Sequence, residues 1–316
     1  MENIVSVLSS CEKVAIFVHT SADADALGSA FSLKYVLEKN DKAADVYLNE
    51  KVSERLSFLQ KFCLLEYQLG ELKDGYDLFV ALDCGDEGRL GVYKDCFVSF
   101  DKTVNIDHHF TNKEYAKYNY VDGNASATGE IITDLLSKMN FTLDKNIAAL
   151  LYAAISSDTG FFAYSNVTKK THVLAGKLLE FGIDSAEINR LLFKTFSLLE
   201  LKLQSFVIEN MKVFHNGKLA VAAITENQLK KFGASYEHTE GLVDILRSVK
   251  DVEIGCLIKE QDGKTKGSIR TNTFVDAAEI SAIFGGGGHK RAAGFSTELS
   301  VEDTLNKFVE ITKDLF

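Results

Sequence analysis

Proline is missing from this chain of 316 residues, although proteins average about 5% proline. A complete absence over this length indicates that prolines were replaced or that the composition is strongly biased.

Cysteine is scarce, and the five thiols are odd in number with no Cys-x-x-Cys pair. This usage favours free thiols in a reducing compartment and argues against a structural zinc site.

Long apolar runs and an excess of positive charge are also lacking. No stretch approaches the ~20 apolar residues that span a bilayer, and the N-terminus has no basic region followed by an apolar core. We therefore expect a cytoplasmic protein that does not bind membranes. The formal net charge of -10 argues against a broad basic surface for long nucleic acid, whereas a metal ion could still supply positive charge for a short anionic substrate.

The sequence does contain acidic residues and histidines at the ends of apolar runs. Three such runs have the character of buried parallel strands, namely residues 14–18, 77–82 and 102–106. The residues that follow them are His19, then Asp83, then Asp107, His108 and His109. Strands that alternate with helices predict a doubly wound parallel-sheet α/β domain, which binds ligands at the carboxyl edge of its sheet.

Three further aspartates lie at helix ends. Asp23 and Asp25 occupy the turn before a helix expected over residues 26–38, where a helix cap is the simpler explanation for either of them. Asp158 ends a mostly apolar helix over 145–157, where a carboxylate is unfavourable next to the helix macrodipole unless a cation compensates it.

The last third of the chain predicts a smaller mixed α+β domain. Strands over 211–214 and 219–224 flank Asn216-Gly217, and strands over 252–259 and 264–270 flank Asp262-Gly263, so we expect two hairpins. One long helix over 184–210 is expected to connect the domains. The predicted boundaries are therefore 1–185 for the catalytic domain, 186–210 for a helical linker and 211–316 for the second domain.

A run of glycines in the second domain is followed by three cationic residues. Gly285 to Gly288 precede His289, Lys290 and Arg291. Glycines expose backbone N–H groups without side-chain obstruction, which suits a phosphate, although the spacing is not that of a P-loop. The alternative is a flexible loop before an edge strand; the adjacent cations favour anion binding.

The acidic residues and histidines point to metal chemistry. Several carboxylates in one crevice repel unless cations neutralise them, and ion pairing is a poor explanation because these turns lack Lys and Arg. Carboxylates alone suit Mg²⁺, whereas added imidazoles shift the preference toward Mn²⁺. Two ions about 3.5–4 Å apart would form a two-metal phosphoryl-transfer site.

These motifs, in this order, resemble the DHH/DHHA1 phosphoesterase family across nearly the whole chain. The resemblance implies a metal set of His19, Asp23, Asp25, Asp83, His108 and Asp158, with Asp83 bridging two Mn²⁺ ions, or Mg²⁺ in their place. It implies His109 as the residue that protonates the leaving oxygen, supported by Asp107. It implies substrate binding by Arg270, Gly286, Gly287, Gly288, His289 and Arg291. The sequence departs from the family at Ala22 and Gly123, where proline is expected, which concerns stability more than activity.

The resemblance extends to substrates. It implies hydrolysis of short oligoribonucleotides to nucleoside monophosphates, with 3′-phosphoadenosine 5′-phosphate (pAp) as a second candidate, in the manner of nanoRNases. The alternative is hydrolysis of cyclic di-AMP or linear pApA, and a non-catalytic nucleotide-binding protein is a third reading that the intact metal ligands disfavour. The resemblance is also compatible with a homodimer.

Overall fold

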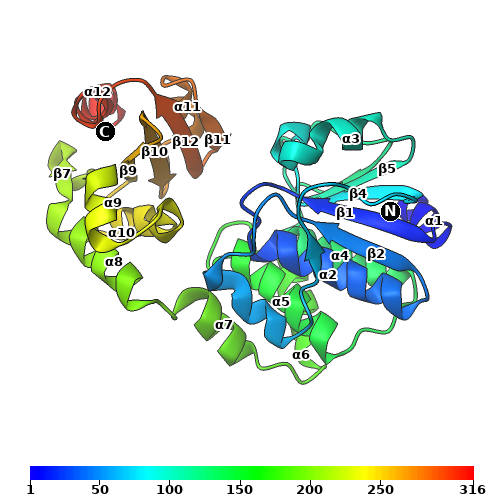
Figure 1. The fold of residues 1–316 in the computed structure, drawn as a ribbon. Helices are drawn as coiled ribbons and strands as arrows, with labels where there is room; N and C mark the ends of the chain where they lie inside the picture. The colour runs from blue at the N-terminus through cyan, green and yellow to red at the C-terminus, as the bar shows by residue number, and fades with distance from the viewer. The chain divides into compact units, whose positions relative to one another are not determined.

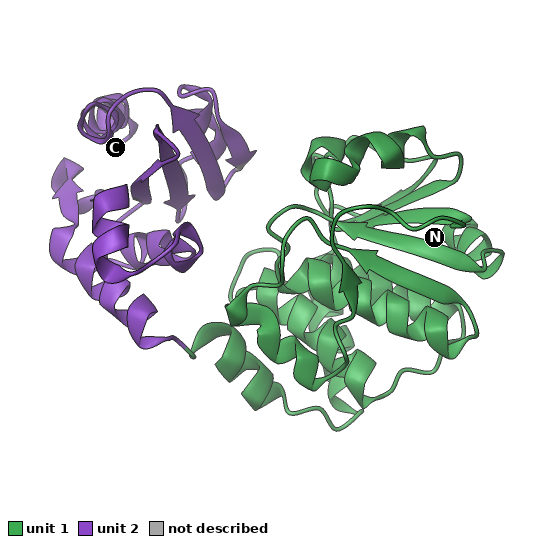
Figure 2. Cartoon of the chain, viewed as in Figure 1, with its two compact units in different colours: residues 1–195 green, residues 196–316 purple. Residues whose placement is uncertain are grey.

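The computed structural model describes residues 1–316 except for the side chain of His289. The chain divides into two compact units, Met1–Thr195 and Phe196–Phe316 (Figure 2). The prediction of one long connecting helix is wrong, because α7 (Ser185–Phe193) belongs to unit 1 and α8 (Leu198–Asn210) to unit 2. Ser197 starts the second helix through a capping box in which it exchanges hydrogen bonds with Glu200.

Unit 1 is built on a six-stranded sheet. Its strands, from one edge to the other, are β3 (Tyr67–Gln68), β2 (Ala43–Tyr47), β1 (Lys13–Val18), β4 (Leu78–Leu82), β5 (Thr103–Asp107) and β6 (Tyr118–Val121). Every neighbouring pair is parallel. The order reverses at β1, which confirms the doubly wound architecture.

Both faces of this sheet are covered, as Figure 1 shows. Along β1, Val14, Ile16 and Val18 pack into the core on the side of α2, α4 and α5, whereas Ala15 and Phe17 pack on the opposite side, toward α3. The helical segments of unit 1 besides α7 are α1 (Glu2–Ser9), α2 (Ala24–Lys39), η1 (Glu54–Lys61), η2 (Glu87–Tyr93), α3 (Lys94–Ser99), α4 (Thr128–Lys138), α5 (Lys145–Asp158) and α6 (Lys169–Leu179). Burial on both faces explains why the strands are continuously apolar.

Unit 2 contains a second six-stranded sheet. Its order is β11 (Gly287–His289), β12 (Ala292–Thr297), β10 (Lys264–Thr271), β9 (Ile254–Gln261), β8 (Leu219–Ile224) and β7 (Lys212–Phe214). Only β8 and β9 pair in parallel among these strands, so the sheet is mixed. Helices and strands occur together in unit 2, as predicted. Besides α8, the helical segments of unit 2 are η3 (His215–Gly217), α9 (Glu226–Phe232), η4 (Tyr236–Thr239), α10 (Leu242–Arg247), α11 (Ala277–Ala282), α12 (Val301–Ile311) and η5 (Lys313–Leu315).

Both predicted hairpins are present, and their turns differ. Asp262 and Gly263 have φ values of 53° and 73°, as a two-residue type I′ turn requires. The other hairpin closes through the 3₁₀ segment η3 instead of Asn216-Gly217 alone. The sequence also favours one helix over residues 237–247. This is wrong, because Gly241, at φ 74°, separates η4 from α10. Among the described residues, no helix is both long and apolar enough to cross a membrane.

Candidate active site

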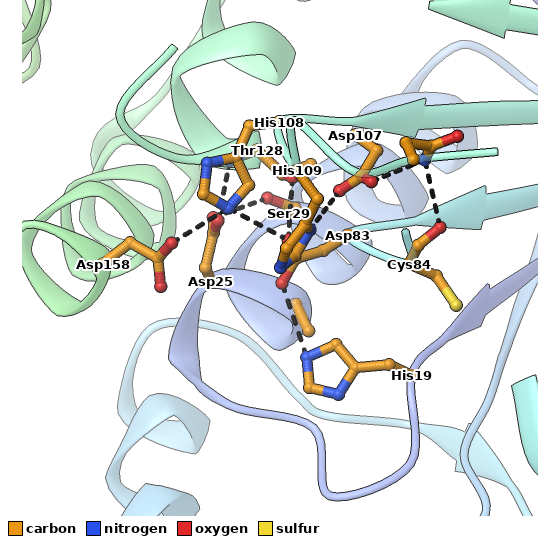
Figure 3. A network of polar contacts seen from close by, with 12 residues as sticks. His19, Asp25, Ser29, Asp83, Cys84, Asp107, His108, His109, Thr128 and Asp158 are labelled. Atoms are coloured by element: carbon orange, nitrogen blue, oxygen red, sulfur yellow. Dashed lines mark hydrogen bonds and ion pairs between the residues drawn. The ribbon is translucent and has the colours of Figure 1, made fainter. Parts of the chain in front are cut away.

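Three neighbouring strands of unit 1 deliver the predicted residues to one edge of the sheet. His19 follows β1, Asp83 follows β4, and Asp107 is the last residue of β5. Figure 3 shows these side chains together with His108, His109, Asp25 and Asp158. The carboxyl edge of the sheet is therefore lined by the acidic residues and histidines that the sequence singled out.

Asp83 lies at the centre of this group. It is 2% exposed and has a φ of 56°, which places a non-glycine residue in the left-handed region, where strain is commonest at functional sites. Its N–H still donates to the carbonyl oxygen of Ile106 at 3.0 Å. Its Oδ1 accepts from the hydroxyl of Thr128 at 3.0 Å. The backbone turn thus aims the carboxylate into the site instead of along the strand.

His19 presents one ring nitrogen to Asp83. Its Nδ1 lies 2.7 Å from the carbonyl oxygen of Thr20, and its Nε2 lies 3.5 Å from Asp83 Oδ2 and 3.9 Å from Asp23 Oδ1. Burial alone would lower the pKa of His19, but the hydrogen bond to Asp83 and the two carboxylate charges raise it to about 9. Because Thr20 and Arg89 occupy the Nδ1 side of the ring, Nε2, which faces the carboxylates, is the nitrogen that can bind a metal.

Asp25 is fully buried and joins two elements that are distant in the sequence. It accepts hydrogen bonds from the N–H groups of Thr128 at 2.7 Å and Gly129 at 2.8 Å, which begin α4. The sequence favours a helix over residues 126–139 with Asn124 or Ser126 as its cap. This is wrong, because α4 begins at Thr128 and its free N–H groups are satisfied by Asp25. Burial, together with neighbouring acidic residues, raises the pKa of Asp25 well above its ordinary value.

The adjacent histidines His108 and His109 have different neighbours. His108 Nε2 lies 3.0 Å from Asp158 Oδ2 and 3.6 Å from Asp83 Oδ1, while its Nδ1 lies 3.3 Å from the carbonyl oxygen of Ala125. Burial would lower the pKa of His108, but the hydrogen bond and charge of Asp158 raise it to about 11. His109 Nδ1 lies 2.6 Å from Asp107 Oδ1. His108 therefore faces carboxylates of the site, and His109 is oriented by Asp107.

Potential metal ligands form three overlapping groups. The groups are His19, Asp23 and Asp83; Asp25, His108 and Asp158; and Asp83, His108 and His109, with the ligand atoms of each group within 4.8 Å of one another. Among the described residues, no Lys or Arg nitrogen forms an ion pair with Asp25, Asp83 or Asp158. Carboxylates that have imidazoles but no Lys or Arg as partners, two of them buried, are a donor set that fits divalent metal ions.

The predicted substrate-binding residues lie in unit 2. Arg270 is on β10, opposite Ala292 of β12, which in turn pairs with residue 289 of β11. The side chain of His289 lies outside the described part of the structure. Arg291 donates to the carbonyl oxygens of Val275 and Thr273, so its guanidinium holds this loop; its contact with substrate stays a prediction.

The glycine run is partly a strand. Residues 287–289 form β11, which pairs with β12, so the segment is not a flexible loop. A Cβ at Gly286 would lie 2.3 Å from the carbonyl oxygen of Gly294, and one at Gly288 would lie 2.5 Å from Ala293 Cα. Close packing against β12 therefore requires glycine at these two positions, independently of any bound anion.

The sequence analysis missed several residues that touch the site. Thr128 donates to Asp25 through its N–H and to Asp83 through its hydroxyl, and Gly129 and Ser29 donate to Asp25. Arg89 contacts His19 Nδ1 at 2.9 Å, and Asn112 donates to Asp107. Only Ser29 lies inside a motif that the sequence displayed. The other residues belong to segments that are distant in the sequence, and no local pattern shows that they lie near the site.

Comparison with known proteins identifies the family. Residues 13–155 match the DHH family, N-terminal domain, and residues 216–316 match the DHHA1 domain. The bifunctional oligoribonuclease and PAP phosphatase NrnA of Thermus thermophilus is 30% identical over 318 residues, which cover 99% of this chain and 94% of that protein. The chain belongs to the DHH family. This DHH protein is accordingly a hydrolase of the phosphoesterase class, and the acidic and histidine groups of unit 1 could hold the metal on which the family depends.

Two further comparisons agree with this assignment. The probable bifunctional oligoribonuclease and PAP phosphatase NrnA of Streptococcus mutans is 29% identical to this DHH protein and covers 93% of the chain and 92% of its own length. An exopolyphosphatase-related protein from Bacteroides fragilis has a similar crystal structure, with a TM-score of 0.89, 25% identity and coverage of 99% of this chain and 96% of its own.

Proposed function

We propose that this DHH protein is a Mn²⁺-dependent two-metal phosphoesterase that hydrolyses short oligoribonucleotides to nucleoside monophosphates, with pAp as a second substrate. The observation that carries the proposal is the meeting of two ligand groups at Asp83, whose oxygens face His19 on one side and His108 on the other. The substrate class follows the Thermus and Streptococcus relatives, which are named as oligoribonucleases and PAP phosphatases.

The donor set supports manganese as the metal of this proposal. One ion would be held by His19, Asp23 and Asp83, and the other by Asp83 together with Asp25, His108 and Asp158. Imidazole combined with carboxylate suits Mn²⁺ better than Mg²⁺, which prefers oxygen ligands alone. Such ions supply Lewis acidity at a phosphoryl oxygen and make water a nucleophile at neutral pH.

The residues around the metal ligands have separate tasks. Asp107 is completely buried and accepts from Asn112 Nδ2 at 2.6 Å on the oxygen that does not face His109. Asp107 therefore fixes the orientation of the His109 ring by holding its Nδ1. Nε2 is then the atom that exchanges a proton with the leaving oxygen. This division is that of an orienting carboxylate and an acid–base imidazole.

Arg270 is the candidate contact for a terminal phosphate in unit 2. Its side chain is about a third exposed, and its Nε lies 3.9 Å from Asp244 Oδ1, too far for a hydrogen bond. Its Nη1 donates to the carbonyl oxygen of Ile269 at 3.1 Å, so Nε and Nη2 are the atoms that would form a bidentate contact with a phosphate. A few such contacts explain how a chain with a net charge of -10 can select short oligonucleotides without a long basic track.

A turnover panel with Mn²⁺ tests the proposal. The substrates are a five-nucleotide RNA, pAp, linear pApA, cyclic di-AMP and pyrophosphate. We expect turnover of the RNA, pApA and pAp, with Asp83→Asn as the inactive control. Preferential turnover of cyclic di-AMP or pyrophosphate would replace the proposed substrate class. Full activity with Mg²⁺ and none with Mn²⁺ would overturn the metal assignment.

A further inference from the structure

Strand β10 places a row of polar residues on one face of the sheet of unit 2. Lys266, Ser268 and Arg270 alternate along the strand and therefore point to the same face. The residue directly opposite Lys266 on β9 is Lys259, and on β12 it is Ser296. Two lysines thus face each other across neighbouring strands.

A helix covers the half of this face that lies toward β8, and the half toward β12 is open. Toward β8, Ala222 and Leu257 pack under Leu242 and Leu246 of α10. Toward β12, the residues on the same face are small or polar and partly or fully exposed: Lys266, Ser268, Arg270, Ala292, Gly294 and Ser296. The open part therefore carries cations above a floor of small side chains, which a ligand can approach closely.

The paired lysines are electrostatically unfavourable by themselves. Like charges directly opposite on adjacent strands destabilise a sheet. Among the described residues, no carboxylate lies within ion-pair distance of Lys266, whereas Lys264, two residues earlier, pairs with Glu298 at 2.8 Å. Lys259 donates to the hydroxyl of Thr239 at 3.3 Å. Burial lowers the pKa of Lys259, and the charges of Lys266 and Arg270 add to this effect against the opposing charge of Glu240.

We propose that Lys259 and Lys266 form a second phosphate subsite, distinct from the contact at Arg270. Lys266 and Arg270 are four residues apart, or ~13 Å along the strand, so their side chains leave the sheet at separate positions of this face. The row is therefore suited to two anionic groups of one extended molecule. This inference rests on the proposed function and specifies its substrate as a single-stranded oligonucleotide that engages unit 2 through more than one phosphate.

The test compares Lys266→Gln with Lys264→Gln in the full chain with Mn²⁺. The probes are a labelled five-nucleotide phosphorothioate RNA, which keeps one charge per linkage and resists hydrolysis, and 5′-AMP, which carries a single phosphate. We expect Lys266→Gln to weaken pentanucleotide binding roughly tenfold, as for one lost hydrogen bond between charged groups. The salt dependence, log K against log[salt], should lose ~0.7 of its slope. AMP binding should change less than twofold, and Lys264→Gln should leave both ligands unchanged.

Charge reversal separates binding from folding. Lys266→Glu would place a carboxylate opposite Lys259, so we expect a higher melting temperature than wild type together with a larger loss of pentanucleotide affinity than in Lys266→Gln. A lysine with only a structural role would not give a more stable protein that binds worse. Lower stability with unchanged affinity would overturn the subsite.

The outcomes also separate this subsite from the proposed function. Unchanged pentanucleotide affinity in Lys266→Gln, or equal losses for the pentanucleotide and AMP, would reject the subsite while leaving RNA hydrolysis intact. A protein that binds the pentanucleotide through Lys266 but turns over none of the RNA substrates would keep the subsite and reject the proposed function.

Discussion

Both units bury carboxylates, and they satisfy them in opposite ways. In unit 2, Glu253 is 4% exposed and accepts hydrogen bonds from the N–H groups of Thr273, Phe274 and Val275 and from the Thr273 hydroxyl. Donors from a single loop therefore satisfy this carboxylate, and the hydrogen bonds hold the loop in place. In unit 1, Asp25 and Asp83 lie in a common cluster with further acidic residues, which hydrogen bonds alone do not neutralise.

The surroundings of each buried carboxylate decide the direction of its pKa shift. The hydrogen bonds of Glu253 outweigh its burial, so its pKa falls below the ordinary value. Burial and neighbouring charges raise the pKa of Asp25, although two backbone N–H groups contact it. Burial would also raise the pKa of Asp83, but the hydrogen bond and charge of His19, together with the charges of His108 and His109, lower it.

Asp83→Asn should have the largest effect of any change in unit 1. Asparagine keeps the volume and tolerates the positive φ, but it removes the charge shared by both ligand groups. We expect turnover of every substrate to fall by roughly 10³-fold or more, because metal-ion catalysis contributes several kcal/mol. Circular dichroism should show a retained fold. Asp86→Asn, in the exposed part of the same loop, is the matched control and should resemble wild type.

His109→Ala should separate acid–base chemistry from metal binding. We expect a loss of 10²–10⁴-fold in kcat, the usual contribution of a positioned acid or base. Manganese stoichiometry, measured by calorimetry, should remain that of wild type, whereas His108→Ala should lose metal because His108 faces Asp158 and Asp83. If His109→Ala instead loses metal and keeps turnover, the roles of the two histidines are exchanged.

The sequence predicted the cluster of acidic residues and histidines better than its surroundings. His19 and Asp83 directly follow apolar strands and Asp107 ends one, so one local pattern places all three at one sheet edge. The contact between Asp25 and Thr128 joins residues 103 positions apart, and no local signal marks it. The helix N-terminus at Thr128 was therefore misplaced, because the group that caps it comes from another element.

In unit 2 the limits of the sequence were of another kind. The hairpin at Asp262-Gly263 was predictable because its turn type depends on two adjacent residues. The opposition of Lys259 and Lys266 depends on strand register, which follows only once that turn is fixed. Short segments such as β3 and η3 lack enough residues to show any periodicity.

Adding manganese should stabilise one unit and not the other. At 100 times its Kd, an ion that binds only the folded state adds ~2.7 kcal/mol, or a rise in melting temperature of about 5–10 °C for a unit of this size. Hydrogen exchange should localise the protection to unit 1, including the N–H groups of Thr128 and Gly129, and EDTA should reverse it. Equal protection of unit 2 would contradict the assignment of metal binding to unit 1.

Arg270→Ala should affect only substrates that carry a terminal phosphate. We expect a loss of ~1.5–3 kcal/mol in kcat/KM for a 5′-phosphorylated dinucleotide, the range for hydrogen bonds to charged groups. Turnover of bis-p-nitrophenyl phosphate, which needs only the metal site, should hardly change. Equal losses on both substrates would mean that Arg270 serves the fold of unit 2, and its role in phosphate binding would have to be abandoned.

Glu253→Gln should have the smallest effect, confined to stability and dependent on pH. Burial would raise the pKa of Glu253, but hydrogen bonds from Thr273, Phe274 and Val275 hold it below the ordinary value. The carboxylate therefore stabilises unit 2 fully above the unfolded pKa of ~4.3 and loses this contribution as pH falls through the lower folded value.

We expect Glu253→Gln to cost ~1–3 kcal/mol near pH 7, because an amide nitrogen then faces N–H donors. In urea unfolding from pH 7 to 3, the difference from wild type should shrink below about pH 4.3, whereas Glu298→Gln, at an exposed position, should show no such difference.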